Sequence, residues 1–156
     1  MDYEEAVRQN LDIVYRAALA CCKNPADAED VVQATFEKLL RSNTVFVNDD
    51  HLRRWLVRVA VNEGRNLWKS FWRRNGSSLE ELGMEPSAPE VRQPALLEEV
   101  LALPVQYRTV LHLYYYEGYS TREIAHLLHL TEANVRTRLK RGRDRLRQQL
   151  EKEELE

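Results

Sequence analysis

Apolar residues recur at helical spacing along most of the chain, and this pattern predicts an all-α protein. The N-terminal half contains three such stretches: Glu4 to about Cys22, 25–42 and 51–74. Asn24 suits the N-cap of the second, Pro25 its first helical position, and the dipole favours the charge of Asp27. The core positions expected in the three helices are Ala6, Ile13, Ala17 and Ala20, then Ala28, Val32, Phe36 and Leu39, then Leu52, Leu56, Val59 and Leu67.

The stretch from Ser120 to Leu146 has the pattern of a helix-turn-helix. Ser120 can cap a first helix while Glu123 reaches back to the Ser120 amide, and Thr131 can cap a second helix. The second helix alternates an apolar face with a strongly basic one, a combination that suits the DNA major groove. A basic run on a terminal helix can also be a solvated face. The apolar face consists of Val135, Leu139, Leu146 and Leu150.

The residues between these patterns resemble a tether. The sequence Asn75-Gly76-Ser77-Ser78 interrupts the helical spacing, and the following residues are rich in Gly, Pro and acids. We therefore expect two small helical domains, 1–75 and 95–156, joined by a flexible linker over 76–94.

The formal net charge of −2 conceals a strong segregation of charge. Residues 51–75 hold seven Lys or Arg against one acid, and residues 136–147 hold seven against one. Residues 1–50 hold ten acids and five bases, and residues 76–100 hold six acids and one base. Two basic stretches with an acidic spacer indicate two contacts with a polyanion.

Several classes of protein do not fit this sequence. No apolar run approaches the roughly 20 residues that span a bilayer, and the N-terminus MDYEE does not resemble a signal peptide. We therefore expect a cytoplasmic protein without membrane insertion. The adjacent Cys21 and Cys22 suit buried thiols better than a disulfide or a metal site. We expect no cofactor and no catalysis, because no phosphate loop, metal-ligand spacing or activated nucleophile is present.

The stretch 51–74 interleaves basic and aromatic residues. Cations bind phosphates and exposed rings stack on unpaired bases, so this mixture suits single-stranded nucleic acid. Trp55 is in step with Leu52 and Leu56 and is expected in the core, whereas Trp68 and Trp72 fit either role.

Taken together, the chain resembles the extracytoplasmic-function (ECF) group of sigma factors in the sigma-70 family. Three stretches carry the likeness in the family's order and cover nearly the whole chain: NPADAEDVVQATFEKLL, HLRRWLVRVAVNEGRNLWKSFWRR and LPVQYRTVLHLYYYEGYSTREIAHLLHLTEANVRTRLKRGRDRLR. The resemblance implies a sigma-2-like domain, a sigma-4-like domain and the function of an alternative RNA polymerase sigma factor, which directs promoter-specific initiation.

The resemblance also implies roles for individual residues. In the first domain, the β′ clamp helices of core RNA polymerase would be bound by Asp27, Asp30, Val31 and Gln33. Asn48, Asp49, Asp50 and His51 fall where the family captures a flipped-out −10 base. The melted strand and its backbone would be held by Asn62, Asn66, Lys69 and Arg73.

In the second domain the implied partners are the −35 element and the β flap of the polymerase. The major groove would be read by Arg136, Thr137, Lys140 and Arg141, with Arg143 in the same set. Arg122 is better placed for a phosphate. A helix pair over 103–116 would provide the apolar base that meets the β flap.

Three positions depart from the family's pattern. His129 occupies the corner where relatives usually have a small residue, often Gly, and a His there must adopt the left-handed conformation. Gly142 replaces a common Ala and is expected to weaken its helix by up to about 1 kcal/mol. Gly64 lies within the basic and aromatic helix.

Two other functions compete with the sigma factor. A stand-alone helix-turn-helix DNA-binding regulator would use the same second domain but leaves the first without a role. A pure interaction adaptor would treat both basic stretches as solvated surface. An anti-sigma factor is a further expected partner, because the polymerase-binding faces would otherwise be exposed.

Overall fold

The computed structural model describes residues 2–22, 24–75, 100 and 102–154. Every regular element in these residues is a helix, so the predicted all-α fold class is confirmed. The chain divides into two compact units, Met1–Met84 and Glu85–Glu156. The predicted linker over 76–94 lies outside the described residues.

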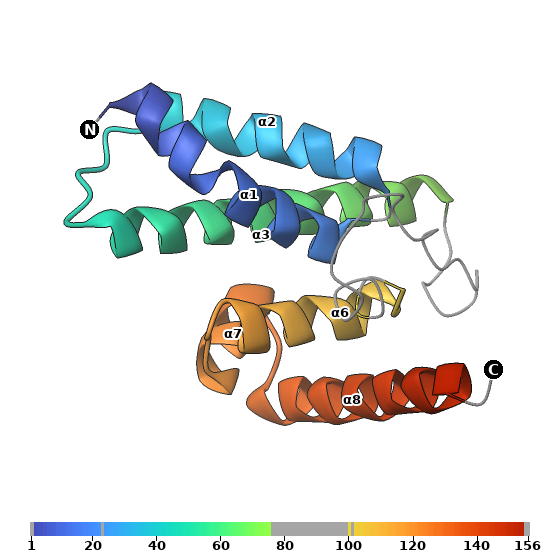
Figure 1. Cartoon of the computed structure of the whole chain (residues 1–156). Coiled ribbons are helices and arrows are strands. Elements are labelled where there is room, and N and C mark those ends of the chain that lie inside the picture. Colours follow the sequence, from blue (N-terminus) through green and yellow to red (C-terminus); the bar gives the residue numbers. More distant parts are fainter. Residues whose placement is uncertain (1, 23, 76–99, 101, 155–156) are drawn as a thin grey trace. The chain divides into compact units, whose positions relative to one another are not determined.

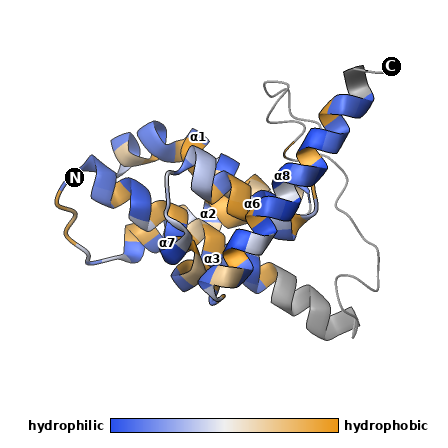
Figure 2. Ribbon diagram, turned by 90° about the horizontal axis from the view of Figure 1, so that it is seen from below, coloured by the Kyte–Doolittle hydropathy of each residue, from blue (hydrophilic) through white to orange (hydrophobic). Residues whose placement is uncertain are grey.

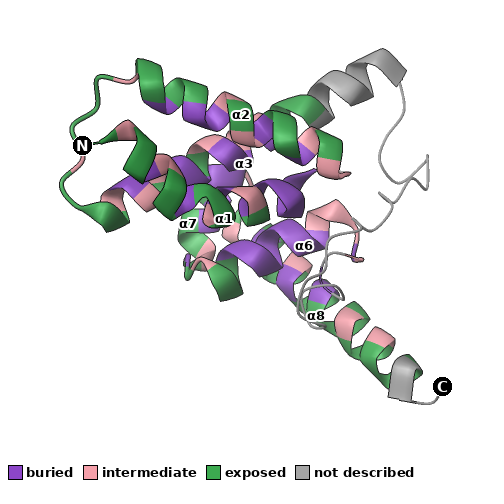
Figure 3. Cartoon of the chain, turned by 45° about the horizontal axis from the view of Figure 1, so that its top comes forward, coloured by how far each residue is buried: buried purple, intermediate pink, exposed green. Residues whose placement is uncertain are grey.

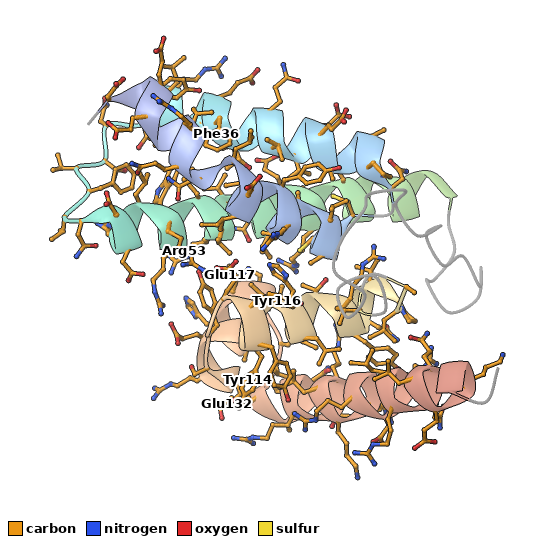
Figure 4. All side chains as sticks on the ribbon, in the orientation of Figure 1. Phe36, Arg53, Tyr114, Tyr116, Glu117 and Glu132 are labelled. Atoms are coloured by element: carbon orange, nitrogen blue, oxygen red, sulfur yellow. The ribbon has the colours of Figure 1, made fainter. Side chains whose placement is uncertain are left out.

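The first unit is built from three helices, α1 (Tyr3–Cys21), α2 (Pro25–Arg41) and α3 (Asp49–Asn75), each of which packs against the other two (Figure 1). Their facing sides bury small and β-branched residues, which let the helices approach closely. Phe36 of α2, labelled in Figure 4, is buried in the same core. The least exposed of the core residues are Val14, Ala17, Ala18, Ala28, Val31, Leu56, Val57, Ala60 and Val61.

Side-chain caps define where these helices begin. The Asp2 carboxylate accepts a hydrogen bond from the Glu4 amide at 3.2 Å, and Asn24 Oδ1 accepts one from the Asp27 amide at 2.8 Å. The predicted Asn24 cap with Pro25 in the first turn is therefore confirmed. The third helix begins two residues earlier than predicted, because Asn48 caps it and brings Asp49 and Asp50 into its first turn.

Four expected core positions are not buried: Ile13, Val32 and Val59 are only half-buried, and Leu67 is exposed. Val32 is only half-buried, because the buried side of α2 runs through Val31 and Thr35 instead. Thr35 tolerates complete burial since its hydroxyl donates to the Val31 carbonyl at 2.7 Å. Leu67 is 39% exposed. It lies almost one turn beyond Gly64, which is where α3 meets the end of α1.

The contact at that end depends on a glycine and a buried thiol. A Cβ at Gly64 would lie 2.8 Å from Cys21 Cβ, so the absent side chain lets α3 approach α1. Cys21 and Cys22 are both buried, as predicted.

The second unit comprises α6 (Val105–Leu111), the π-helix η1 (His112–Tyr116), α7 (Thr121–Leu128) and α8 (Glu132–Glu154). Both α6 and α7 pack on α8. Leu103, Val110, Leu113, Ile124 and Val135 are almost completely buried between them. Figure 3 shows buried positions on α6 and mainly exposed ones along α8.

The expected helix pair over 103–116 is a single continuous helix instead. Its last turns widen from α into π geometry at His112, whose backbone carbonyl accepts from the Glu117 amide at 3.1 Å. The widened turn buries the His112 ring, 3.5 Å from Glu117 Oε1 and stacked on Tyr116. It leaves Tyr114, Tyr115 and Tyr116 substantially exposed, and Figure 4 labels two of them.

Gly142 serves packing in this unit. A Cβ there would lie 3.0 Å from Leu111 Cδ1 and 3.2 Å from Tyr107 Cβ. Gly142 is a weak helix former, but its missing side chain permits the close approach of α6 and α8. Helix propensity alone does not predict this packing role.

The polar surfaces of the helices are evident in Figure 2, where hydrophilic positions alternate with apolar ones. Among the described helices, none combines the length and apolar character needed to cross a membrane.

Candidate nucleic-acid and polymerase interfaces

The helix-turn-helix expected from the sequence is present in the second unit. Ser120 Oγ accepts from the Glu123 amide at 3.1 Å, and Glu123 Oε1 accepts from the Ser120 amide at 3.0 Å, which completes the capping box. His129 turns the chain with φ 57° and ψ 45°, the left-handed conformation predicted for it. Thr131 Oγ1 then accepts from the Asn134 amide at 3.1 Å and caps α8. The corner is thus formed without glycine.

One side of α8 anchors the helix while another presents polar groups. Val135 and Leu139 are buried against the other helices of the unit. The five residues implied in groove reading are all exposed, namely Arg136, Thr137, Lys140, Arg141 and Arg143. Arg136 is paired with Glu132 at 2.7 Å, one turn earlier, so in the free protein its guanidinium is held along the helix. Arg122 is exposed in the first turn of α7.

Contacts within the second unit involve three bases of α8, one of which, Arg143, belongs to the implied groove-reading set. Arg138 is half-buried and donates to Asn134 Oδ1 at 2.9 Å; its partial burial lowers the pKa of the guanidinium. The guanidinium of Arg145 lies 5.0 Å from the centre of the Tyr107 ring, a cation–π geometry. Arg143 donates to the Tyr115 hydroxyl at 3.0 Å. The bases of α8 therefore differ in their contacts: Arg143 and Arg145 reach tyrosines of η1 and α6, whereas Arg136 and Arg138 contact residues of α8 itself.

An apolar groove of about 630 Å³ lies beside these contacts in the second unit. The sequence predicted an apolar surface over 103–116 and an apolar face on α8 that includes Leu146 and Leu150, but not that the two line one groove. In the structure neither Leu146 nor Leu150 is fully buried, so both side chains are available to line the groove. The residues that line the groove are Val100, Leu111, Tyr115, Tyr116, Arg143, Leu146, Arg147 and Leu150.

In the first unit, the turn before α3 is held by short polar and aromatic contacts. Asn48 Oδ1 accepts from the His51 amide at 2.8 Å, and His51 Nδ1 accepts from the Val47 amide at 3.0 Å. Phe46 lies edge-on to His51 and to Trp55, with ring centres 5.2 and 5.5 Å away. Trp55 is half-buried, so the expectation of a core position is met only in part.

A hollow of about 380 Å³ adjoins this turn. Asn48 and Asp49 line it, while Asp50 is exposed and lies 3.6 Å from Arg54 Nε. The N-terminal helix supplies the remaining polar wall, which sequence reasoning did not foresee because these residues are distant in the chain. The lining consists of Asp2, Glu5, Ala6, Gln9, Phe46, Asn48, Asp49 and Leu52.

The other residues implied in strand binding follow along α3. Asn62 is half-buried and Asn66 is exposed. The side chains of Lys69 and Arg73, with those of Trp68 and Trp72, lie outside the described residues.

The face of α2 implied in polymerase binding is only partly at the surface. Asp30 and Gln33 are exposed, and Asp27 is half-buried, where its carboxylate accepts from Asn24 Nδ2 at 3.3 Å. Val31 was expected on the same surface but is 1% exposed. Its side chain packs inside the three-helix core and is not available to a partner.

The fold and these surfaces define a class of two-unit, all-α proteins with a helix-turn-helix in the C-terminal unit. Residues 6–77 match the description "Sigma-70 region 2", and residues 94–146 match "Sigma-70, region 4". The chain is a member of the sigma-70 family, in its ECF group.

Relatives with established names agree with this membership. The chain is 33% identical to the ECF RNA polymerase sigma factor SigE of Mycolicibacterium smegmatis, with 96% of the chain and 62% of the relative covered. It is 31% identical to the RNA polymerase sigma factor SigV of Bacillus subtilis, with 90% and 86% covered. SigM of Bacillus subtilis is 28% identical, with 94% of each chain covered.

A solved structure shares the fold. The sigma factor RpoE from Bartonella quintana, in complex with the anti-sigma factor NepR, matches with a TM-score of 0.68 at 21% identity, covering 96% of this chain and 97% of that one. Because family matches span both units, the reading as a stand-alone regulator loses its main support.

Proposed function

We propose that this sigma factor recruits core RNA polymerase to promoters through separate contacts with the −35 and −10 elements. The observation that carries the proposal is the capped, correctly turned helix-turn-helix with Arg136, Thr137, Lys140 and Arg141 exposed on α8. Arginine there can pair with guanine O6 and N7, which contributes about 1–3 kcal/mol of discrimination. Arg122 is suited to a neighbouring phosphate. Arg143 is already bonded to Tyr115 and is better suited to supporting η1 than to reading a base.

In the first unit, the turn at 48–51 would bind an extruded base of the −10 element. Base extrusion costs a few kcal/mol, which contacts in a pocket must offset. The hollow beside Asn48 and Asp49 offers oxygen acceptors next to the aromatic Phe46, a combination that suits an unstacked base. Asn62, Asn66, Lys69 and Arg73 follow on the same helix and would hold the strand that leaves the pocket.

Core polymerase would contact both units. Asp27, Asp30 and Gln33 provide polar groups on α2 that suit the basic and amide side chains of a partner helix, the β′ clamp helices. The apolar groove of the second unit suits a helix with apolar residues along one side, as expected for the β flap. An anti-sigma factor would compete for these same surfaces.

The polymerase contacts can be tested by co-elution of the full chain with core enzyme. Asp30→Arg reverses an exposed charge on α2, and Leu146→Glu places a charge in the groove. Each should weaken binding by about tenfold or more. The first change places a cation opposite the basic groups expected on the partner, and the second leaves an unpaired carboxylate against the partner's apolar side. Glu151→Arg, an exposed change on α8 outside the groove lining, is the control. Binding by both variants equal to that of the unmodified chain would contradict the proposed contacts.

A further inference from the structure

The turn before α3 has an unusual attachment to its helix. Val45 and Val47 are 86% and 83% exposed, so the chain at 45–47 has little apolar anchorage apart from Phe46. The contacts described for it are the Phe46 ring and the hydrogen bond from the Val47 amide to His51 Nδ1. The position of this turn relative to α3 therefore depends strongly on His51.

The arrangement is a capping box in which histidine replaces the usual acid or amide. Asn48 caps α3 and accepts from the amide of His51, its third helical residue. In the usual box the side chain at that third position returns a hydrogen bond to the N-cap amide. Here the imidazole returns it one residue earlier, to Val47, so the box fixes the chain before the cap as well as the helix itself.

The bond also defines the state of the ring. Nδ1 can accept the Val47 N–H only if it carries no proton, so the ring proton lies on Nε2. The same ring packs against the edge of Phe46, whose other contact is Trp55. Phe46, Asn48, Asp49 and Leu52 all line the hollow. One imidazole thus supports the wall of the pocket proposed for the −10 base.

We propose that His51 is a positioning residue: by accepting the Val47 N–H it holds the promoter-reading turn in place, rather than contacting the extruded base itself. This inference rests on the proposed function of the 48–51 turn, and it distinguishes His51 from Asn48 and Asp49, which face the hollow. An acceptor at this position is the required property, not the imidazole as such.

Two substitutions separate the acceptor from the ring. His51→Phe keeps an aromatic ring against Phe46 but has no acceptor, whereas His51→Gln keeps an acceptor that can complete a capping box. With core polymerase and a duplex promoter, His51→Phe should reduce open-complex formation about three- to tenfold, as expected for one lost hydrogen bond. His51→Gln should remain within about twofold of the unmodified chain. His126→Phe, at an exposed site on α7, is the matched control.

A measurement on the full chain alone keeps this inference separate from the proposed function. The ¹⁵N shifts of the His51 ring at neutral pH should show the Nε2–H tautomer, and the Val47 amide should exchange faster in His51→Phe but not in His51→Gln. A protonated Nδ1, or unchanged exchange in His51→Phe, would overturn the inference whatever the protein does in transcription. If both variants lost open complexes while His51→Gln preserved amide protection, His51 would contact the promoter directly and the positioning role would be wrong.

Discussion

At the scale of single residues, two glycines permit close contacts between helices. Gly64 meets the side chain of Cys21 at the end of α1, and Gly142 meets Tyr107 and Leu111 of α6. Helix propensity argues against glycine at both positions. The geometry explains their presence, because a side chain at either site would have to displace a neighbour.

Gly64→Ala tests this explanation most sharply. The new Cβ would lie 2.8 Å from Cys21 Cβ, an atom fixed by the backbone of α1, so the helices must separate. We expect a loss of about 1–3 kcal/mol in the free energy of unfolding, despite the gain in helix propensity. Urea unfolding of the full chain, followed by circular dichroism, measures it.

The control for this prediction is a double-mutant cycle with Cys21→Gly, which removes the opposing Cβ. The combined variant should lose less stability than the sum of the two single changes. A Gly64→Ala protein more stable than the unmodified chain would show that propensity outweighs packing at this site.

At the scale of elements, the basic residues of α8 differ in what they contact, and under the proposed function they would differ in role. Arg138, Arg143 and Arg145 contact Asn134, Tyr115 and Tyr107 in their own unit. Arg136, Lys140 and Arg141 are exposed, and Arg136 pairs with Glu132 on the same helix. The charge pattern alone could not separate these groups, since it shows only that seven bases surround one acid between 136 and 147.

This division predicts different consequences for two arginines of the same helix. Arg141→Ala should weaken promoter binding by the polymerase complex by about 1–3 kcal/mol and relax base preference in the −35 element. Arg145→Ala should leave that preference intact and instead reduce stability by about 0.5–1 kcal/mol, because the contact with Tyr107 is lost. Competition binding with mutated −35 sequences, alongside urea unfolding, measures both quantities. Equal loss of base preference in the two variants would refute the division.

The elements also show how far sequence reasoning reaches. Local signals succeeded: Asn24 with Pro25, the Ser120–Glu123 box, Thr131 and the left-handed His129 are all visible within a few residues. Properties that depend on neighbouring helices did not follow from periodicity. Val31 is buried where a partner contact was expected, and Leu67 is exposed because α3 continues past α1. The continuous α6–η1 helix was predicted as two helices.

The candidate site shows the same limit. The exposed set on α8 follows from helical spacing and a resemblance to relatives. The hollow beside Asn48 could not be predicted, because its other wall comes from Asp2, Glu5 and Gln9 at the far end of the sequence. Nor does any local pattern indicate that His51 bonds backward to Val47. The hollow forms only when helices distant in the sequence pack together, whereas the His51 bond is local but departs from the usual capping box.

At the scale of the whole molecule, the proposed function requires both units to act in one complex. The sigma-70 region 2 and region 4 matches cover separate units, and each unit carries its own exposed polar surface. A protein that used only its helix-turn-helix would bind duplex DNA without polymerase. Recruitment of core enzyme, in contrast, makes the α2 face, the −10 turn and the groove of the second unit necessary together.

Run-off transcription with purified core polymerase and a pool of genomic promoter fragments tests this claim most directly. We expect discrete transcripts that depend on the added chain and fall at least about tenfold with Arg136→Ala combined with Arg141→Ala. Lys152→Ala, an exposed cation near the end of α8, should leave them unchanged. An absence of transcripts, together with no stable complex between the chain and core polymerase, would contradict the account.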